Sequence, residues 1–310
     1  MTPPAEPSGH PSVEELFSRS PVLGEAMEGL LRAARSEAPI LLLGEAGSGR
    51  STLARAVHAS SSRADELLVE IDSGSIPVSL FESELFGHRR GAFTGAETSR
   101  EGKVERAEGG SLLLDQVEEI PRESQPKLLR FLSERRFQPL GGRERKADVR
   151  FLAVGTLDLP DRVEQGVFRS DLYYRLEVLA FRVPPLRERR EDLPALCRRM
   201  IADVARRLGV EPKPLSEATR SWMSDYPWPG NLRELRNLLE RSLILSRGEE
   251  LDPDPPREPG EDRPRTLQEV EIEEIRKALA YTRGHQGRAA ELLGISRKGL
   301  WAKRKRYGIP

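Results

Sequence analysis

Two short stretches of the chain carry residue types that suit phosphate chemistry. Residues 44–51, GEAGSGRS, form a glycine-rich loop between a short apolar run and a helix-forming segment. A loop in that position turns backbone N–H groups and a helix N-terminus toward phosphates. Residues 109–116, GGSLLLDQ, have the pattern of a buried strand that ends in an acid, and Asp115 is the expected magnesium ligand. The loop residues predicted to cradle a phosphate are Gly44, Glu45, Ala46, Gly47, Ser48, Gly49, Arg50 and Ser51.

The elements that position these residues are predicted to alternate between strands and helices. Apolar runs at 39–43, 67–71 and 150–154 have the length of buried parallel strands, as does the run before Asp115. Helix-forming residues follow the phosphate loop, and leucines at helical spacing predict a further helix over 123–134. The fold class is therefore α/β, a P-loop domain whose parallel sheet is flanked by helices. Beyond residue 184 the spacing predicts helices alone.

Composition describes a soluble globular protein of two or three domains. The 310 residues are 37% hydrophobic and 32% charged, with 50 basic and 50 acidic side chains. The single Cys197 excludes internal disulfides, and four scattered histidines indicate no metal cluster. No apolar run approaches the length of a membrane span, and no charged-then-apolar leader precedes the chain. We expect a cytoplasmic protein without a membrane partner.

Basic residues gather at the C-terminus, where we expect contact with duplex DNA. From 283 to 310 there are eight Lys or Arg and one Glu, a difference of +7. Helical patterns over 267–281, 288–293 and 297–307 predict a helix-turn-helix, with Gly294 at the turn and Ser296 as the N-cap of the last helix. Leu292 and Trp301 are among the apolar residues expected to pack against the first helix. The predicted DNA-binding residues are Arg288, Ser296, Arg297, Lys298, Lys303, Arg304 and Arg306.

Residues 82–96, ESELFGHRRGAFTGA, are the most specific motif of the chain. They resemble the signature of bacterial enhancer-binding proteins, the AAA+ activators of sigma-54 RNA polymerase, and the resemblance extends from about residue 20 to residue 310. It implies an ATP-dependent remodeller that assembles as a hexameric or heptameric ring and ends in dimeric Fis-type DNA-binding domains. It also implies that the sigma factor is contacted by an exposed loop made of Gly91, Ala92, Phe93, Thr94, Gly95 and Ala96.

The resemblance implies further roles and a domain plan. Arg169 and Arg175 match arginine fingers that reach a neighbouring subunit's nucleotide, and Arg233 matches the second sensor arginine of the lid. A permanently charged guanidinium suits charge that develops on a transferring phosphoryl group. The expected parts are a disordered lead (1–14), the AAA+ α/β subdomain (15–184), the helical lid (185–247), a proline-rich linker (248–266) and the Fis-type domain (267–310).

Four residues depart from the family pattern, and all belong to the nucleotide site. Arg50 replaces the loop lysine, and its broader guanidinium is expected to displace the loop or to point away. Gln116 replaces the catalytic glutamate, and an amide cannot accept a proton near pH 7. Asp72 and Thr156 stand where asparagines are usual, so Asp72 and Gln116 form a swapped amide–carboxylate pair in which Asp72 is a candidate base. Hydrolysis should suffer more than binding.

Two hypotheses remain, and a third is disfavoured. The first is an ATP-driven remodeller of sigma-54 polymerase, which the GAFTGA string favours. The second is a hydrolysis-impaired regulator that acts as a structural subunit, a mixed-ring partner or a competitor, which Arg50 and Gln116 favour. A metabolic kinase is disfavoured because no acceptor pocket follows the loop and the chain ends in a DNA-binding pattern. Whether the chain is an enzyme depends on its ATP turnover.

Overall fold

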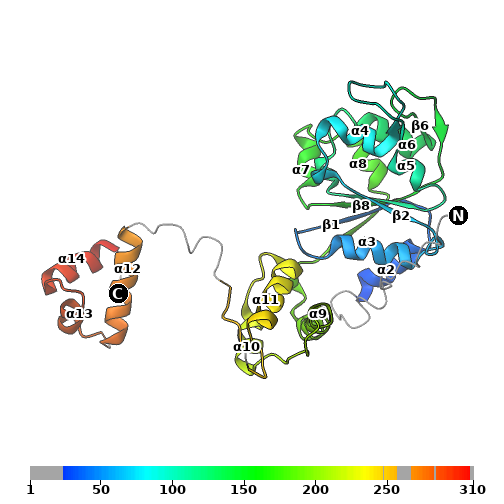
Figure 1. Cartoon of the computed structure of the whole chain (residues 1–310). Helices are drawn as coiled ribbons and strands as arrows, with labels where there is room; N and C mark the ends of the chain where they lie inside the picture. The colour runs from blue at the N-terminus through cyan, green and yellow to red at the C-terminus, as the bar shows by residue number, and fades with distance from the viewer. Residues whose placement is uncertain (1–23, 247, 257–266, 283, 308–310) are drawn as a thin grey trace. The chain divides into compact units, whose positions relative to one another are not determined.

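The computed structural model describes residues 24–246, 248–256, 267–282 and 284–307, as two compact units that divide between residues 255 and 256 (Figure 1). The predicted lead, 1–14, lies outside the described residues. Each unit is described by itself.

The first unit is built on a five-stranded sheet in the order β2-β5-β8-β1-β9, and every pair is parallel. The α/β fold class is therefore confirmed. The order brings the ends of β1 and β5 to the two sides of β8, where the carboxyl ends of parallel strands meet. The strands are β1 (Ile40–Gly44), β2 (Leu68–Asp72), β5 (Ser111–Asp115), β8 (Arg150–Gly155) and β9 (Leu179–Val183).

Helices cover both faces of this sheet because successive strand side chains point to opposite sides. In β1, Leu41 joins one buried cluster, while Ile40 and Leu42 join the other. Helices α2 (Gly24–Ala34) and α3 (Arg50–Ala59) pack on the face that carries Ile40 and Leu42, which we call the second face (Figure 1). The first face is covered by α4 (Val78–Phe86), α5 (Lys103–Arg106), α6 (Gln125–Glu134), α7 (Leu159–Glu164) and α8 (Ser170–Leu176).

Short elements connect these layers. Two small antiparallel ladders pair β3 (Gly87–His88) with β4 (Arg100–Glu101), and β6 (Arg136–Phe137) with β7 (Arg145–Lys146). Short 3-10 turns follow several strands, at η1 (Ser73–Ser75), η2 (Val117–Glu119), η3 (Leu186–Glu188) and η4 (Arg190–Asp192).

A helical lid follows the sheet, in α9 (Leu193–Leu208), α10 (Glu217–Asp225) and α11 (Asn231–Leu245). Trp228, 1% exposed, lies in its core and donates from Nε1 to the Met223 carbonyl oxygen at 3.0 Å. The lid extends further than expected, because Leu251 is fully buried in the same core and exchanges backbone hydrogen bonds with Pro214 and Ser216. The predicted linker therefore begins too early, and residues 257–266 of it lie outside the described residues.

The second unit contains three helices in its described part, α12 (Leu267–Tyr281), α13 (Gln286–Leu292) and α14 (Arg297–Tyr307). Ile275, Ala289 and Leu300 lie in its small core. Leu292 and Trp301 were expected in that core, but they are 59% and 56% exposed. Leu300 is the buried residue of α14, and Trp301 is turned by about 100° from it around the helix. Across the described residues, no helix has the length and apolar character needed to cross a membrane.

Candidate functional site

The phosphate loop leaves β1 at Gly44 and enters α3 at Arg50. Its turn depends on Gly47 and Gly49, whose φ angles are +75° and +101°. Ser51, in the first turn of α3, donates from Oγ to Asp115 Oδ2 at 2.6 Å. The structure thus brings together the hydroxyl and the carboxylate that would hold Mg²⁺ beside the phosphates, and this pair fits such an ion. No group of three or more His, Cys, Asp or Glu in the described part of the chain could hold a metal, which is compatible with Mg²⁺ because that ion keeps several waters.

Asp72 and Gln116 meet at the ends of neighbouring strands. Asp72 is in register with Asp115 across β2 and β5, and Gln116 follows with a φ of +55°. The Gln116 Nε2 donates to Asp72 Oδ1, and its backbone N–H donates to Asp115 Oδ1 at 2.9 Å. The expected contact between amide and carboxylate is present. The roles of these two residues in catalysis stay predictions.

Arg50 points from the loop to the end of β8. Its Nη1 donates to the carbonyl oxygen of Gly155, and the residue is only 8% exposed. Burial lowers the pKa of this guanidinium, while the negative charges of Glu118 and Asp115 act in the opposite direction. The glycine turns of the loop are intact, and the guanidinium points toward β8 instead of along the loop. This is one of the two outcomes expected for Arg50.

Thr156, the sensor position, directly follows β8. Its backbone N–H donates to Glu118 Oε2 at 3.3 Å, and Glu118 is 7% exposed. Glu118 was missed by sequence reasoning. The only signal in the sequence was an acid three residues beyond Asp115. The 3-10 turn η2 brings its carboxylate to the end of β8, and such a contact cannot be predicted from neighbouring residues.

The lid docks on the phosphate loop through the start of α11. The Leu232 N–H donates to the Gly47 carbonyl oxygen at 2.9 Å. Asn231, fully buried with a φ of +52°, donates from Nδ2 to the Ala46 carbonyl oxygen at 3.1 Å, and its Oδ1 accepts from the Leu186 N–H at 2.8 Å. Arg233 is the second residue after Asn231, and its Cβ lies 3.2 Å from where a Cβ on Gly47 would be. The Cβ of the predicted sensor arginine, Arg233, therefore lies beside the phosphate loop.

A second link between lid and loop is an ion pair. Arg187 donates from Nη2 and Nη1 to the two carboxylate oxygens of Glu45 at 2.6 and 2.8 Å. The hydrogen bonds from Arg187 lower the pKa of Glu45 to about 2, so this loop residue stays ionised. Asn231 also donates to Glu45 at 3.2 Å. Neither Asn231 nor Arg187 was singled out from the sequence, although the Pro-Gly-Asn turn before α11 was a signal for the former.

The two candidate arginine fingers lie at the surface of α8. Arg169 precedes the helix and forms two hydrogen bonds with the Asp171 carboxylate, at 2.7 and 3.0 Å, which lower the pKa of Asp171. Arg175 donates to the Leu132 carbonyl oxygen at 3.0 Å. Both arginines are exposed. Their side chains form hydrogen bonds with α8 and α6 and not with the phosphate loop of their own chain.

The signature loop, residues 91–96, is a compact turn closed by the Gly91 N–H, which donates to the Ala96 carbonyl oxygen at 2.8 Å. Phe93 is 39% exposed and packs edge-on against His88, with 5.1 Å between ring centroids. Ala96 is the buried end of the loop. The expected exposure of Phe93 agrees with the structure, while contact with a sigma factor stays a prediction.

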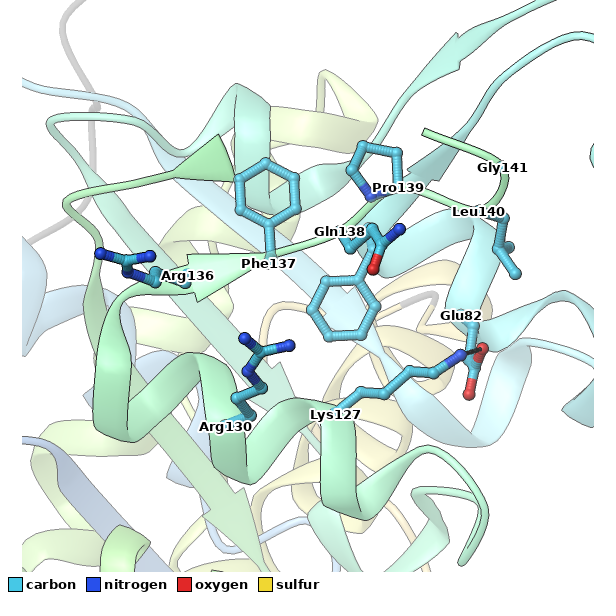
Figure 2. Close-up of a pocket in the computed structure, with 10 residues that line it drawn as sticks. Glu82, Lys127, Arg130, Arg136, Phe137, Gln138, Pro139, Leu140 and Gly141 are labelled. Carbon is cyan, nitrogen blue, oxygen red and sulfur yellow. Dashed lines mark hydrogen bonds and ion pairs between the residues drawn. The ribbon is translucent and has the colours of Figure 1, made fainter. Parts of the chain in front are cut away.

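A neighbouring segment, 138–141, supports this loop. The Arg89 N–H donates to the Leu140 carbonyl oxygen at 2.9 Å, and a Cβ on Gly141 would lie 3.1 Å from Ala92 Cβ. Behind the segment is a pocket of about 300 Å³ between α4 and α6, with Phe137 in its wall (Figure 2). Its cations are already paired, for example Lys127 with Glu82. The cations of the pocket are therefore not available to a ligand. Its wall segment 138–141 instead supports the signature loop through the contacts given above.

The second unit presents a basic face on α14. Ser296 caps the helix, since its Oγ accepts from the Gly299 N–H at 3.0 Å, and Gly294 makes the turn with a φ of +66°. Arg297 and Lys298 are exposed. Lys303, also predicted to bind DNA, is half-buried, and its Nζ is paired with Glu271. Among the other predicted residues, Arg288 and Arg306 are exposed and Arg304 is half-buried.

A parallel sheet with a phosphate loop after β1, an acid at the end of β5 and a helical lid docked on the loop define a AAA+ nucleotide-binding module. Models of three known families cover the chain, namely the sigma-54 interaction domain over residues 16–182, the AAA+ ATPase lid domain over 187–262 and the Fis family of bacterial regulatory proteins over 266–307. The chain belongs to the family of sigma-54-dependent enhancer-binding activators.

Individual relatives agree along nearly the whole chain. It is 43% identical to the alginate biosynthesis transcriptional regulatory protein AlgB of Pseudomonas aeruginosa over 303 residues, covering 95% of this chain and 68% of that one. It is 38% identical to the regulatory protein AtoC of Escherichia coli, covering 95% and 68%. Among solved structures, NtrX from Brucella abortus has a TM-score of 0.71 at 34% identity, covering 94% and 68%. NtrX has also been solved in complex with ATP, where the TM-score is 0.69.

Proposed function

We propose that this regulator binds ATP with Mg²⁺ at the phosphate loop and couples that binding to remodelling of sigma-54 RNA polymerase in the cytoplasm. The observation that carries the proposal is the 2.6 Å hydrogen bond between Ser51 Oγ and Asp115 Oδ2. In P-loop NTPases a hydroxyl and a carboxylate so placed hold the ion that neutralises phosphate charge. The ATP complex of NtrX, a relative of similar fold, supports the proposal.

Magnesium-dependent ATP binding tests it. In a calorimetric titration of the whole chain, we expect ATP affinity to rise when Mg²⁺ is added. Asp115→Asn should lose most of that rise, because a neutral amide oxygen is a weaker ligand for a hard cation than a carboxylate. Asp148→Asn, which changes an acid at the other end of the sheet, is the matched control. The proposal would be contradicted if ATP failed to bind with or without the ion.

Assembly into a hexameric or heptameric ring is part of the proposal. The exposed positions of Arg169, just before α8, and of Arg175, on α8, support it, because a finger that serves a neighbour must lie at the surface of its own subunit. Arg233, beside the loop of its own chain, would instead sense the nucleotide in cis.

The loop 91–96 is proposed to touch the sigma factor, and Phe93 allows a test. We expect Phe93→Ala to change the free energy of unfolding by less than about 0.5 kcal/mol, because truncation of an exposed side chain usually has a small effect. Binding to purified sigma-54 should drop. Both are measured on the same samples, by thermal melting and by a pull-down or anisotropy assay. Phe137→Ala, in the buried wall of the neighbouring pocket, is the contrasting variant, with an expected loss of about 3–5 kcal/mol. If Phe93→Ala melted as early as Phe137→Ala and kept sigma binding, the loop would have been misassigned.

The exposed basic face of α14 is proposed to enter the major groove of duplex DNA, with two such units on a palindromic site. Salt dependence tests this, because each phosphate contact contributes about 0.9 to the slope of log affinity against log salt. We expect Lys298→Ala to reduce the slope by about one if Lys298 binds a phosphate. If Lys298 contacts a base, the salt slope should stay the same, and the variant should discriminate less between bases at one position of the DNA site. Lys277→Ala, an exposed lysine on α12 that is paired with Glu273 and Glu274, should leave both unchanged. A chain whose DNA affinity showed no salt dependence would refute the proposal.

The alternative, a hydrolysis-impaired structural subunit, mixed-ring partner or competitor, receives no support from the comparisons. It rests on Arg50 and Gln116 alone, and ATP turnover decides it.

A further inference from the structure

The Arg50 guanidinium and the Glu118 carboxylate bind the same peptide group at the end of β8, in an arrangement that no motif predicts. The Gly155 carbonyl oxygen accepts from Arg50 Nη1, and the next peptide N–H, that of Thr156, donates to Glu118 Oε2. Glu118 Oε2 also lies 3.3 Å from where a Cβ on Gly155 would be. A guanidinium and a carboxylate are therefore bound to the C=O and the N–H of the peptide group that joins the last residue of β8 to Thr156.

Both charges are withdrawn from water, with Arg50 8% and Glu118 7% exposed. A buried charge is costly unless an opposite charge or hydrogen bonds compensate it. Three carboxylates act on the pKa of Arg50, those of Glu118, Asp115 and Asp158, and Glu118 has the largest effect of the three. Asp158 is paired with Arg162. Asp115 already accepts hydrogen bonds from Ser51 and from the Gln116 backbone. Glu118 is thus the main counter-charge of Arg50.

We propose that Glu118 is a positioning residue of the nucleotide site, which holds the Arg50 guanidinium on the end of β8 and makes it compete with the β- and γ-phosphates of a bound nucleoside triphosphate. The inference rests on the proposed nucleotide binding. Arg50 starts α3 directly after the phosphate loop, so its side chain can serve either the strand or the phosphates. The negative charge of Glu118 favours the conformation in which the Arg50 guanidinium binds β8. Removal of that charge should release the guanidinium to the ligand.

A shorter cation at position 50 separates this mechanism from simple repulsion between Glu118 and the phosphates. The Nη1 atom of arginine is one bond further from the backbone than the Nζ atom of lysine. Arg50→Lys therefore keeps the charge but shortens the reach toward Gly155. Repulsion between Glu118 and the phosphates is the same in both backgrounds, whereas retention of the cation on β8 is specific to arginine.

The experiment is a titration of the full chain with a fluorescent, non-hydrolysable ATP analogue and Mg²⁺. We expect Glu118→Gln to tighten binding about tenfold with Arg50 present, within the range of coupling between residues of one hydrogen-bond network. In the Arg50→Lys background the same change should tighten binding by no more than about twofold. Glu119→Gln, an exposed neighbour that pairs with Arg162, should have no effect in either background. Equal tightening in both backgrounds would overturn the proposal.

Thermal stability without nucleotide gives a second, independent measurement, made on the wild type, Glu118→Gln, Arg50→Lys and the double variant. Glu118→Gln should lower the melting temperature clearly with Arg50, because it leaves a buried cation without its counter-charge, and should lower it less with lysine. Equal losses would overturn the proposal even if none of the proteins bound the analogue. In that last case the proposed nucleotide binding would fail, and the melting data alone would still decide the role of Glu118.

Discussion

Replacing Gln116 with glutamate, together with Asp72→Asn, is expected to raise steady-state ATP turnover by about 10²–10⁴-fold, the usual contribution of a general base. The amide of Gln116 cannot take a proton from an attacking water near neutral pH, although it can orient one. Its Nε2 already donates to Asp72 Oδ1. The double variant keeps this hydrogen bond and exchanges only which partner carries the charge.

The single variants show why both changes are needed. Gln116→Glu alone would place two carboxylates in contact, and like charges at that distance raise the pKa of one of them. The new glutamate would then be partly protonated or displaced, so we expect a smaller gain than in the double variant. Asp72→Asn alone tests the swapped pair. If Asp72 is the base of the wild-type protein, its residual turnover should disappear.

Turnover is measured at saturating ATP and Mg²⁺ over a range of protein concentrations, because a ring site would need its neighbour. Glu119→Gln is the control for a change of charge near the site, and it should not alter the rate. A wild-type rate equal to that of the double variant would show that Gln116 does not limit hydrolysis. The second hypothesis, an impaired regulator, would then lose its main argument.

Local patterns predicted the parts of the site that depend on sequence neighbours. The phosphate loop, the acid at the end of β5 and the N-cap at Ser296 are fixed by spacing within a few residues, and the structure places all three where expected. The contact between Asp72 and Gln116 could also be inferred, because parallel strands end at one edge of the sheet.

Contacts between distant segments could not be predicted in this way. Glu118 reaches Thr156 across 38 residues, and Asn231 reaches the phosphate loop across 185. The strand β9 at the edge of the sheet was not predicted. Its apolar run, VLAF at 178–181, is short and is followed by Arg182, and a run of that length does not distinguish a strand from part of a helix. The pairing of Lys303 with Glu271 was not predicted, because no pattern in α14 shows the facing carboxylate on α12.

Gly47→Ala is expected to be the most damaging single change of a small residue in the chain's described nucleotide site. The position has a φ of +75°, which costs an alanine about 1–2 kcal/mol. The new Cβ would also lie 2.4 Å from the Gly230 carbonyl oxygen, a backbone atom of the lid. The start of α11 would have to move, and with it the hydrogen bond from Leu232 to Gly47.

Gly109→Ala separates strain from steric clash. Gly109 has the same φ of +75°, but a Cβ there meets no atom within 4 Å. Both variants should lose about 1–2 kcal/mol from the backbone, and Gly47→Ala should lose a further 1–3 kcal/mol from overpacking. Unfolding of the lid is followed by the fluorescence of Trp222 and Trp228, in a Trp301→Phe background that removes the tryptophan of the second unit.

Nucleotide affinity provides the functional half of this comparison. The N–H groups of the phosphate loop must keep their directions to bind phosphates, so Gly47→Ala should weaken ATP-analogue binding strongly while Gly109→Ala leaves it unchanged. The docked lid makes this effect larger than strain alone, because Arg233 moves together with the start of α11. If the two alanine variants lost equal stability and bound the analogue equally well, the contact between the lid and the phosphate loop would not exist in solution, and the assignment of Arg233 as a sensor in cis would fall with it.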